Sequence, residues 1–370
     1  KYGTEVVTAK TIGYSSFSKK CKTISKDVAT ISFYGEALMS DKKILLSGIQ
    51  PSGKLCIGNY IGALKNWVNL QDEYESIFLV VDMHALTVKQ VPSELRQRCL
   101  SFVAQYIACG IEPETNTIVI QSHVPQHAEL MWVLNSITSM GELNRMTQFK
   151  DKSKQYNKNI NVGLFSYPVL MASDILLYQA DVVPVGADQK QHLELARDLA
   201  HRFNHQYSDT FKVPEPFIPK TGARIMSLQD PDKKMSKSDE NDNNILGLLD
   251  PADVLIKKIK RAVTDSGTDI VYDESRPGLA NLLGIYAKLS DRSIDEIVGE
   301  FEGKMYSQFK SDLGELVVET LRPVQEKYSK LMDDRGYLET ILKEGSDKSF
   351  VHARKTLSKV YRKVGFLPKK

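Results

Sequence analysis

Short runs of β-branched and apolar residues alternate with longer stretches of helical periodicity between Lys43 and about Arg224. This alternation constrains the fold more than any other feature of the chain. We expect strands over residues 44–49, 77–82, 117–121 and 181–185. Alternating strands and helices build a parallel, doubly wound sheet, whose ligand crevice lies beyond the carboxyl ends of the strands. We therefore predict an α/β fold of Rossmann type and expect the functional residues to follow its strands.

The stretch 94–109 illustrates the helices of this pattern. Leu95, Cys99, Phe102 and Tyr106 recur at helical spacing, and Gly110 follows the last of them. That spacing predicts a helix whose apolar stripe faces the core and which ends at the glycine.

The strand pattern stops after about Arg224. The polar stretch 230–244 predicts a long mobile loop, and such loops in compact proteins are usually functional. Residues 251–367 then indicate helices, for example 252–263, 278–289 and 313–332. We therefore divide the chain into a loosely ordered extension over 1–41, with the folded part beginning near Met39, an α/β domain over 42–227, a loop over 228–246 and an all-helical domain over 247–370, whose last helix we expect to pack back on the α/β domain.

Composition narrows the class of protein. A chain of 370 residues has room for about two or three domains. Its 49 basic and 46 acidic residues leave a net charge of +3, so nucleic-acid binding has to come from local patches. No uncharged apolar run approaches the roughly 18 residues of a membrane span. The four cysteines stand alone, which disfavours a zinc site or a disulfide scaffold and indicates a reducing compartment.

The first chemical motif follows the first expected strand. Ser47 to Gly53 form a turn rich in small residues, and Cys56 to Gly62 open the next helix. A strand–turn–helix junction directs free N–H groups outward and can hold phosphate. Gly58 and Gly62 lie on one helix face, where they allow either the approach of a flat ring or tight helix–strand packing; the glycines by themselves favour packing. Asn59 adds a neutral donor beside them.

The second motif is Lys233-Lys234-Met235-Ser236-Lys237-Ser238, in the predicted loop. Two lysines three residues apart, on a loop able to close, can neutralise the charge that develops when a triphosphate breaks. Such a transfer needs positioning and charge stabilisation rather than a protein nucleophile. The alternative is a solvated basic turn, which is the usual meaning of a charge run.

Together these motifs resemble the class I aminoacyl-tRNA synthetases, whose signature pairs a degenerate H-I-G-H element, here Cys56-Ile57-Gly58-Asn59, with Lys234-Met235-Ser236-Lys237-Ser238. The surrounding sequence resembles more specifically the bacterial-type tryptophanyl-tRNA synthetases. The segments that carry this likeness are 48–53, 141–143, 146–150, 171–178, 183–186 and 188–189. It extends from about Lys43 to the C-terminus.

A second group of residues suggests an amino-acid pocket. Tyr167, Met171, Asp174 and Tyr178 fall on one stripe of a helix. A carboxylate among such side chains needs donors, which are backbone amides if Asp174 is structural or a ligand if it is functional. The resemblance implies that Asp174 and Met171 bind the indole, with Asp174 accepting its N–H.

The resemblance also implies roles for further residues. It implies that Tyr167 and Gln189 hold the α-amino group, that Gln50 reaches the carboxylate and that Val183 and Val185 wall the indole. The implied substrate-binding set is Gln50, His84, Tyr167, Met171, Asp174, Val183, Val185 and Gln189. The implied ATP-binding set is Gln50, Ser52, Gly58, Asn59, Gly186, Asp188, Gln189, Met226, Lys234, Met235, Ser236, Lys237 and Ser238. Lys234, Lys237 and Lys152 are the implied catalytic residues.

Three positions depart from the family pattern. Cys56 stands where Thr or His is more common, Ala187 where Glu is common, and Met83 where Gln is frequent. Because a thiol is a poor hydrogen-bond partner, we rank Cys56 below Asn59 as a phosphate contact.

The resemblance implies ATP-dependent attachment of L-tryptophan to tRNA(Trp) by a cytoplasmic homodimer, with Mg2+ arriving on ATP and no structural metal. Two basic stretches in the helical part can contact RNA phosphates. They comprise Lys257, Lys258, Lys260 and Arg261, and His352, Arg354, Lys355, Lys359, Arg362, Lys363, Lys369 and Lys370. The alternatives are a tyrosyl-tRNA synthetase, whose loop usually has K-F-G-K-S, and a non-catalytic RNA-binding paralogue.

Overall fold

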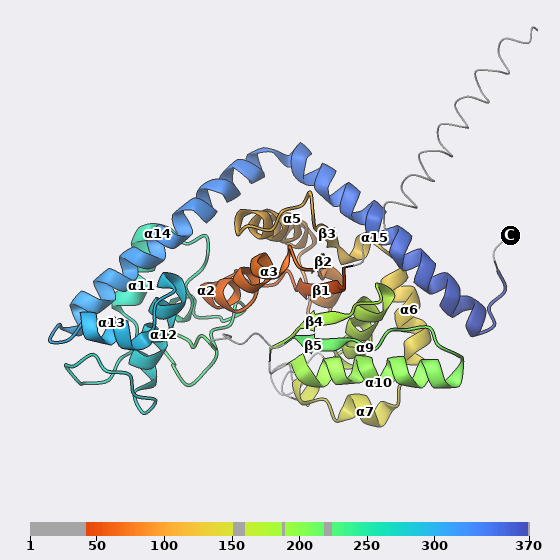
Figure 1. Ribbon diagram of the computed structural model, residues 1–370, viewed down its shortest axis with the longest axis horizontal. Coiled ribbons are helices and arrows are strands. Elements are labelled where there is room, and N and C mark those ends of the chain that lie inside the picture. The colour runs from red at the N-terminus through yellow and green to blue at the C-terminus, as the bar shows by residue number, and fades with distance from the viewer. Residues whose placement is uncertain (1–41, 151–159, 187–188, 218–223, 369–370) are drawn as a thin grey trace, which may run out of the picture. The chain divides into compact units, whose positions relative to one another are not determined.

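A parallel sheet of five strands, in the order β3-β2-β1-β4-β5, organises the described part of the chain (Figure 1). The computed structural model describes residues 42–150, 160–186, 189–217 and 224–368. The strands are β1 (Ile44–Ile49), β2 (Glu75–Val80), β3 (Thr117–Ile120), β4 (Val182–Pro184) and β5 (Glu215–Phe217). The chain adds strands on one side of β1 and then continues on the other side with β4. The predicted doubly wound fold is therefore confirmed, and its crevice lies beyond the carboxyl ends of β1 and β4.

The predicted strands correspond to β1 to β4, with small shifts at the ends of three of them. β5 was not predicted. It pairs only with β4 and contains Pro216. Proline disfavours a strand in sequence, yet an edge strand tolerates it because one side of the strand has no ladder to complete.

The sheet is buried on both faces because successive side chains point to opposite sides. Leu45 and Phe78 face one layer, and Leu46 and Leu79 face the other. The first layer contains α3 (Lys65–Leu70) and α5 (Pro92–Ala108), where Trp67 stacks on Phe78 with 4.8 Å between ring centroids. The second layer contains α6 (Gln126–Asn135), α9 (Val162–Leu177) and α10 (Lys190–Gln206). The helix predicted over 94–109 is α5, and Gly110 follows it with a φ of +111°.

The remaining described elements connect or extend these layers. Before residue 224 they are α2 (Ile57–Asn59), a π-helix (Tyr60–Leu64), α4 (Asp82–Ala85), a 3-10 turn (Gln121–His123) and α7 (Met140–Asn144). After it they are a 3-10 turn (Asp242–Asn244), α11 (Ala252–Lys260), α12 (Pro277–Ser290), α13 (Ile294–Glu300), α14 (Tyr306–Asp333) and α15 (Arg335–Lys363). The helix predicted over 313–332 begins earlier, at Tyr306, because Phe309 is buried in the core as well.

The last helix, α15, crosses the edge strand β3 (Figure 1). Gly345 allows this approach, since a Cβ built there would lie 2.0 Å from the carbonyl oxygen of Ile118. Tyr361, near the end of α15, donates to Glu129 of α6 at 2.6 Å. A sheet edge covered in this way cannot pair with another chain.

Residues 43–370 form one compact unit by their contacts, so the predicted boundary between an α/β and a helical domain stays a prediction. The predicted extension over 1–41 lies outside the described residues. No helix among the described residues has the length and apolarity to cross a bilayer.

The crossing at Gly345 leads to a stability prediction. Gly345→Ala should lower the free energy of unfolding by at least about 2 kcal/mol, because the new methyl group would overlap a backbone carbonyl that cannot rotate away. Gly284→Ala in α12 is the matched control, since no described atom outside its own helix turns lies within 4 Å of a Cβ built there. It should stabilise the protein by about 0.5–1 kcal/mol through helix propensity. Urea unfolding of both variants tests this, and equal effects would contradict the packing described for α15.

Candidate active site

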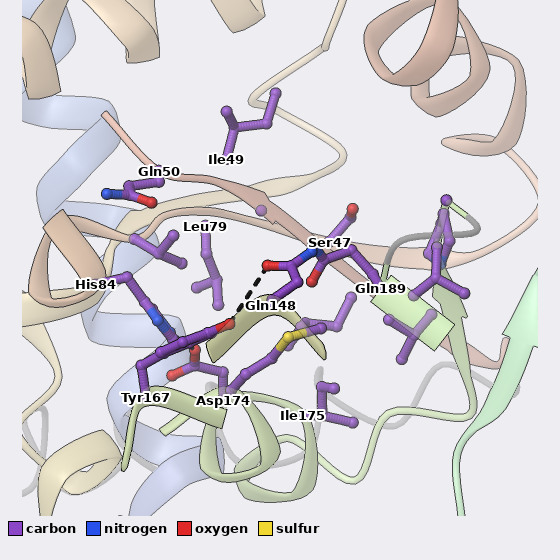
Figure 2. A pocket seen from close by; sticks show the side chains of 18 of the residues that line it. Ser47, Ile49, Gln50, Leu79, His84, Gln148, Tyr167, Asp174, Ile175 and Gln189 are labelled. Carbon is purple, nitrogen blue, oxygen red and sulfur yellow. Dashed lines mark hydrogen bonds and ion pairs between the residues drawn. The ribbon is translucent and has the colours of Figure 1, made fainter. Parts of the chain in front are cut away.

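A cavity of about 280 Å³ opens at the carboxyl ends of β1 and β4, where the topology places a ligand crevice. Figure 2 shows side chains from β1, α4 and α9 converging on it. Its lining residues are Leu46, Ser47, Gly48, Ile49, Gln50, Leu79, Val81, His84, Thr87, Gln148, Tyr167, Met171, Asp174, Ile175, Val183, Pro184, Val185, Gly186 and Gln189. The structure thus brings together all eight residues of the implied substrate-binding set, but not Tyr178 of the predicted helix stripe.

The carboxylate of Asp174 is the charged group in the wall of this cavity, and it is 3% exposed. His127 Nδ1 and Gln121 Nε2 each lie 2.7 Å from its Oδ1, and His84 Nε2 lies 2.8 Å from its Oδ2. Burial raises the pKa of the Asp174 carboxyl, but hydrogen bonds from His127 and His84 outweigh it and hold the pKa below its usual value. Asp174 is therefore an anion whose donors among the described residues are side chains rather than the backbone amides considered from sequence.

The tautomer of His127 follows from this contact. A carboxylate only accepts, so Nδ1 carries the proton. In the neutral ring Nε2 then accepts from the Tyr178 hydroxyl, which lies 2.9 Å away. Burial raises the pKa of Tyr178, so the hydroxyl keeps its proton. Tyr178 thus supports Asp174 through His127 and is absent from the described cavity lining.

Sequence reasoning did not assign Gln121 or His127 to the site. Gln121 directly follows β3, and His127 lies in the first turn of α6. The position of Gln121 at the carboxyl end of a predicted strand was a usable signal. His127 had none, because its contact with Asp174 spans 47 residues of sequence.

Tyr167 lies on the same face of α9, one turn before Met171. Its hydroxyl donates to Gln148 Oε1 at 3.3 Å (Figure 2) and lies 2.8 Å from His192 Nε2. Burial raises the pKa of Tyr167, which keeps the phenol protonated. Gln148 and His192 were not predicted, although Gln148 lies within a segment quoted for the resemblance.

Cys56 is the N-cap of α2, the helix that follows the first strand, and its side chain is fully buried. Burial raises the pKa of its thiol. Asn59 Oδ1 accepts from the Cys56 N–H at 3.1 Å and lies 3.3 Å from Sγ. Among the described residues, no atom lies within 4 Å of a Cβ built at Gly62, so tight helix–strand packing does not explain that glycine.

The lysine loop, residues 233–238, lies against the turn that follows β1. Lys237 Nζ donates to the carbonyl oxygen of Gln50 and lies 5.4 Å from the centre of the Phe102 ring. The Lys54 N–H donates to the Lys237 carbonyl at 2.9 Å. Gly53 is required here, because its φ is +62° and a Cβ would lie 1.8 Å from the Lys237 oxygen. The loop is therefore joined to Gln50, which also lines the cavity.

The stretch 230–244, predicted as a long loop, contains local backbone pairing. Met226 forms an antiparallel bridge with Lys234, and Met235 is 4% exposed. Asn281 of α12 bonds both the N–H and the carbonyl of Met226, at 2.8 and 3.0 Å. This asparagine was not predicted. The predicted site residues Lys152 and Asp188, and the departure at Ala187, lie outside the described residues.

Comparisons with known proteins point to one family. The family model described as "tRNA synthetases class I (W and Y)" matches residues 39–322. The tryptophan–tRNA ligase of Clostridium tetani is 55% identical over 333 residues, which cover 90% of this chain and 98% of that protein. The tryptophan–tRNA ligase of Clostridium acetobutylicum is 54% identical over 332 residues, or 89% and 99% of the two chains.

Solved structures agree with these sequence relatives. The tryptophanyl-tRNA synthetase of Mycoplasma pneumoniae superposes with a TM-score of 0.82 at 36% identity, covering 88% of this chain and 98% of that one. The Campylobacter jejuni enzyme, solved with ADP and tryptophan, gives 0.76 at 36% identity, covering 87% and 100%. A tyrosyl-tRNA synthetase from Aeropyrum pernix gives 0.61 at 19% identity, covering 82% and 89%, which shows a shared fold alone.

The hydrogen bonds to Asp174 predict a pH-dependent contribution to stability. Asp174→Asn should lower the free energy of unfolding by about 3 kcal/mol at neutral pH, because it removes the charge that three buried donors face. The folded pKa of this carboxyl lies below its usual 3.8, so its contribution is present above that pH and is lost as the pH falls through the folded value.

The difference in free energy of unfolding between wild type and Asp174→Asn should therefore be constant near neutrality and shrink in acid below about pH 4. Chemical unfolding over a pH series measures it. Glu274→Gln is the control, because Glu274 is exposed and its side chain forms no hydrogen bond or ion pair with another described residue. A difference that grew with acidity would show that Asp174 is protonated in the folded protein.

Proposed function

The chain belongs to the class I tRNA synthetases for tryptophan and tyrosine, among the tryptophan–tRNA ligases, and from that premise we propose how its residues use ATP to attach L-tryptophan to tRNA(Trp). The observation that carries the proposal is the buried, ionised Asp174 in an otherwise largely apolar cavity that also contains Gln50. Gln50 in turn is bonded to the lysine loop. One cavity can thus select the amino acid and present it to the nucleotide.

Asp174 is proposed to accept the indole N–H, the only polar hydrogen of the tryptophan side chain. A carboxylate has about four acceptor positions, and the hydrogen bonds from His84, Gln121 and His127 leave room for one more. A substrate that cannot donate leaves that position unpaired, which penalises phenylalanine. Tyrosine would need a donor as well as an acceptor for its hydroxyl, but the side chains of His84, Gln121 and His127 already donate to Asp174.

The other lining residues are proposed to hold the rest of the substrate. Val183 and Val185 form walls for the indole beside Met171. The α-amino group is held by Tyr167 and Gln189, and Gln50 reaches the carboxylate. The cavity volume of about 280 Å³ lies near the lower limit of the roughly 300–1,000 Å³ usual for ligand sites, as expected for a single amino acid.

The nucleotide is proposed to bind on the other side of Gln50. The residues assigned to it are Ser52, Gly58, Asn59, Gly186, Asp188, Gln189, Met226, Met235, Ser236 and Ser238, together with Lys234 and Lys237. The open space beside Gly62 and the loop contacts with residues 50–54 support this placement. Mg2+ enters bound to the ATP phosphates, so this proposal needs no preformed metal site.

The chemistry then needs no covalent enzyme intermediate. A tryptophan carboxylate oxygen forms a bond to the α-phosphorus in line, and the bond to the bridging oxygen of pyrophosphate breaks. Lys234, Lys237 and Lys152 stabilise the charge on the leaving pyrophosphate. A ribose hydroxyl of the terminal adenosine of tRNA next attacks the activated carbonyl, loses its proton and releases AMP.

The helical part is proposed to bind the anticodon region of tRNA through exposed basic residues. Those that the structure describes as exposed are Lys257, Lys260, Arg261, Arg354, Lys355, Lys359 and Arg362. Lys258, predicted to belong to this set, is 3% exposed, so that prediction is wrong. We assign the enzyme to the cytoplasm on its isolated cysteines, of which Cys56, Cys99 and Cys109 are free thiols.

We also propose a homodimer. Large apolar side chains are exposed directly after α4 and on α6, α7 and α9: Leu86 is 63% exposed, Trp132 74%, Met140 67% and Val162 79%. Asn161 donates to the Thr87 carbonyl at 2.9 Å, which brings the segments of Leu86 and Val162 together. Exposed apolar groups of this size favour association with another surface.

Trp132→Arg should therefore shift the protein from dimer to monomer at micromolar concentration, because it places a charge on the proposed interface. Sedimentation velocity measures the shift. Leu367→Arg is the control, since Leu367 is 95% exposed near the end of the chain. A wild-type protein that sediments as a monomer would refute the homodimer.

The activity is tested by ATP–pyrophosphate exchange with each of the twenty amino acids. We expect exchange with tryptophan alone. Exchange with tyrosine would favour the tyrosyl alternative, and no exchange would favour a paralogue that only binds RNA. In the same assay, Asp174→Ala should raise the KM for tryptophan by about 100-fold, with little change in the KM for ATP. Equal losses for both substrates would contradict the role given to Asp174.

A further inference from the structure

A buried lysine of α11 connects the two motifs of the nucleotide end. Lys258 is 3% exposed, and its Nζ lies 2.7 Å from Asp250 Oδ2 and 2.7 Å from Asp242 Oδ2. An ammonium group in such a place is costly to bury unless carboxylates compensate its charge. Both partners lie earlier in the chain than α11, four and twelve residues after the end of the lysine loop.

The Asp250 contact anchors Lys258 to the start of the helix at Cys56. Asp250 Oδ2 also accepts from the N–H of Gly247 at 2.9 Å, and Gly247 pairs with Cys56 in an antiparallel bridge. The neighbouring residues continue the pairing, because the N–H of Leu248 donates to Leu55 and that of Ile57 to Leu246, both at 2.8 Å. Asp250 is 7% exposed, so this half of the arrangement is protected from water.

The Asp242 contact leads to the lysine loop through Lys54. Asp242 lies five residues after Lys237, and its Oδ1 accepts from Lys54 Nζ at 2.8 Å. Lys54 is the residue whose N–H bonds the Lys237 carbonyl. Hydrogen bonds from Lys258 and Lys54 hold the pKa of the Asp242 carboxyl below its usual value, so it stays charged. Its side chain is 50% exposed, which makes this the half that can break and re-form.

We propose that Lys258, Asp250 and Asp242 form an ion-pair clamp that positions Lys237 over the nucleotide end. The inference rests on the proposed function, because it gives Lys258 a part in the ATP half of that reaction. Lys258 is a positioning residue: it acts on Lys237 through Asp242 and is not itself assigned to a substrate. The Lys258–Asp250 pair fixes Lys258, and the Lys258–Asp242 pair holds the segment that directly follows the lysine loop. The clamp thereby links the helical part of the chain to the step in which ATP is cleaved.

Asp242→Asn tests the clamp in the full-length protein. It keeps the shape of the side chain, removes the charge and leaves the buried Lys258–Asp250 pair intact. We expect kcat/KM for ATP in tryptophan-dependent exchange to fall about tenfold, because a misplaced Lys237 stabilises the leaving group poorly. The KM for tryptophan should stay within about twofold. Asp242→Glu should restore part of the loss, since the charge returns.

Two further variants separate the clamp from its surroundings. Glu240→Gln removes a nearby exposed acid whose side chain forms no hydrogen bond or ion pair with another described residue, and it should leave exchange unchanged. Lys54→Met breaks only the ion pair between Lys54 and Asp242, and it should lower kcat/KM for ATP less than Asp242→Asn does. If Lys54→Met causes the whole loss, Lys54 rather than Lys258 holds the loop and the proposal is overturned.

Limited trypsin digestion gives a readout that does not depend on activity. Cleavage after Lys233, Lys234 or Lys237, followed by mass spectrometry, should be several-fold faster in Asp242→Asn than in wild type or Glu240→Gln. Wild-type cleavage rates together with an unchanged kcat/KM for ATP would overturn the clamp. A wild-type protein without tryptophan-dependent exchange would instead refute the proposed function, and the digestion would still decide whether the clamp holds the loop.

Discussion

The hydrogen bonds that converge on the buried carboxylate of Asp174 are the interaction on which the cavity depends. Their donors come from three places in the chain: His84 in α4 after β2, Gln121 after β3 and His127 in α6. A buried carboxylate without donors would take up a proton or destabilise the fold. Keeping it ionised therefore requires β2, β3 and α9 to stay in one arrangement, so the stability of the sheet and the chemistry of the cavity have a common origin.

The turn after β1 joins this cavity to the lysine loop. The Gln50 residue lines the cavity, while its carbonyl oxygen accepts from Lys237. The positive φ of Gly53 lets the loop backbone come into contact with this turn. A parallel sheet favours such a junction, because the strand order reverses beside β1 and leaves its carboxyl end open to both sides. An amino acid and a nucleotide can then meet at one residue.

Sequence predicted the elements well and the residues of the cavity in part. The stripe of Tyr167, Met171 and Asp174 follows from helical spacing, and the resemblance added Gln50, His84 and the valines, all of which line the cavity. The supporting groups His127 and His192 were missed because single polar residues carry no periodic signal. Gln121 was missed although it ends a predicted strand. Lys258 was placed on the surface wrongly, since a charge run has the same letters whether a lysine is exposed or paired inside.

By itself, the sequence determined the order of strands and helices, the glycines that its turns require and the letters of both motifs, because backbone preferences and apolar periodicity act between near neighbours. Tertiary structure alone decided which donors face Asp174 and which carboxylates compensate Lys258. His84 and Asp174 are 90 residues apart, and Gln50 and Lys237 are 187 apart. Contacts across such distances depend on how whole layers pack, which no local pattern encodes.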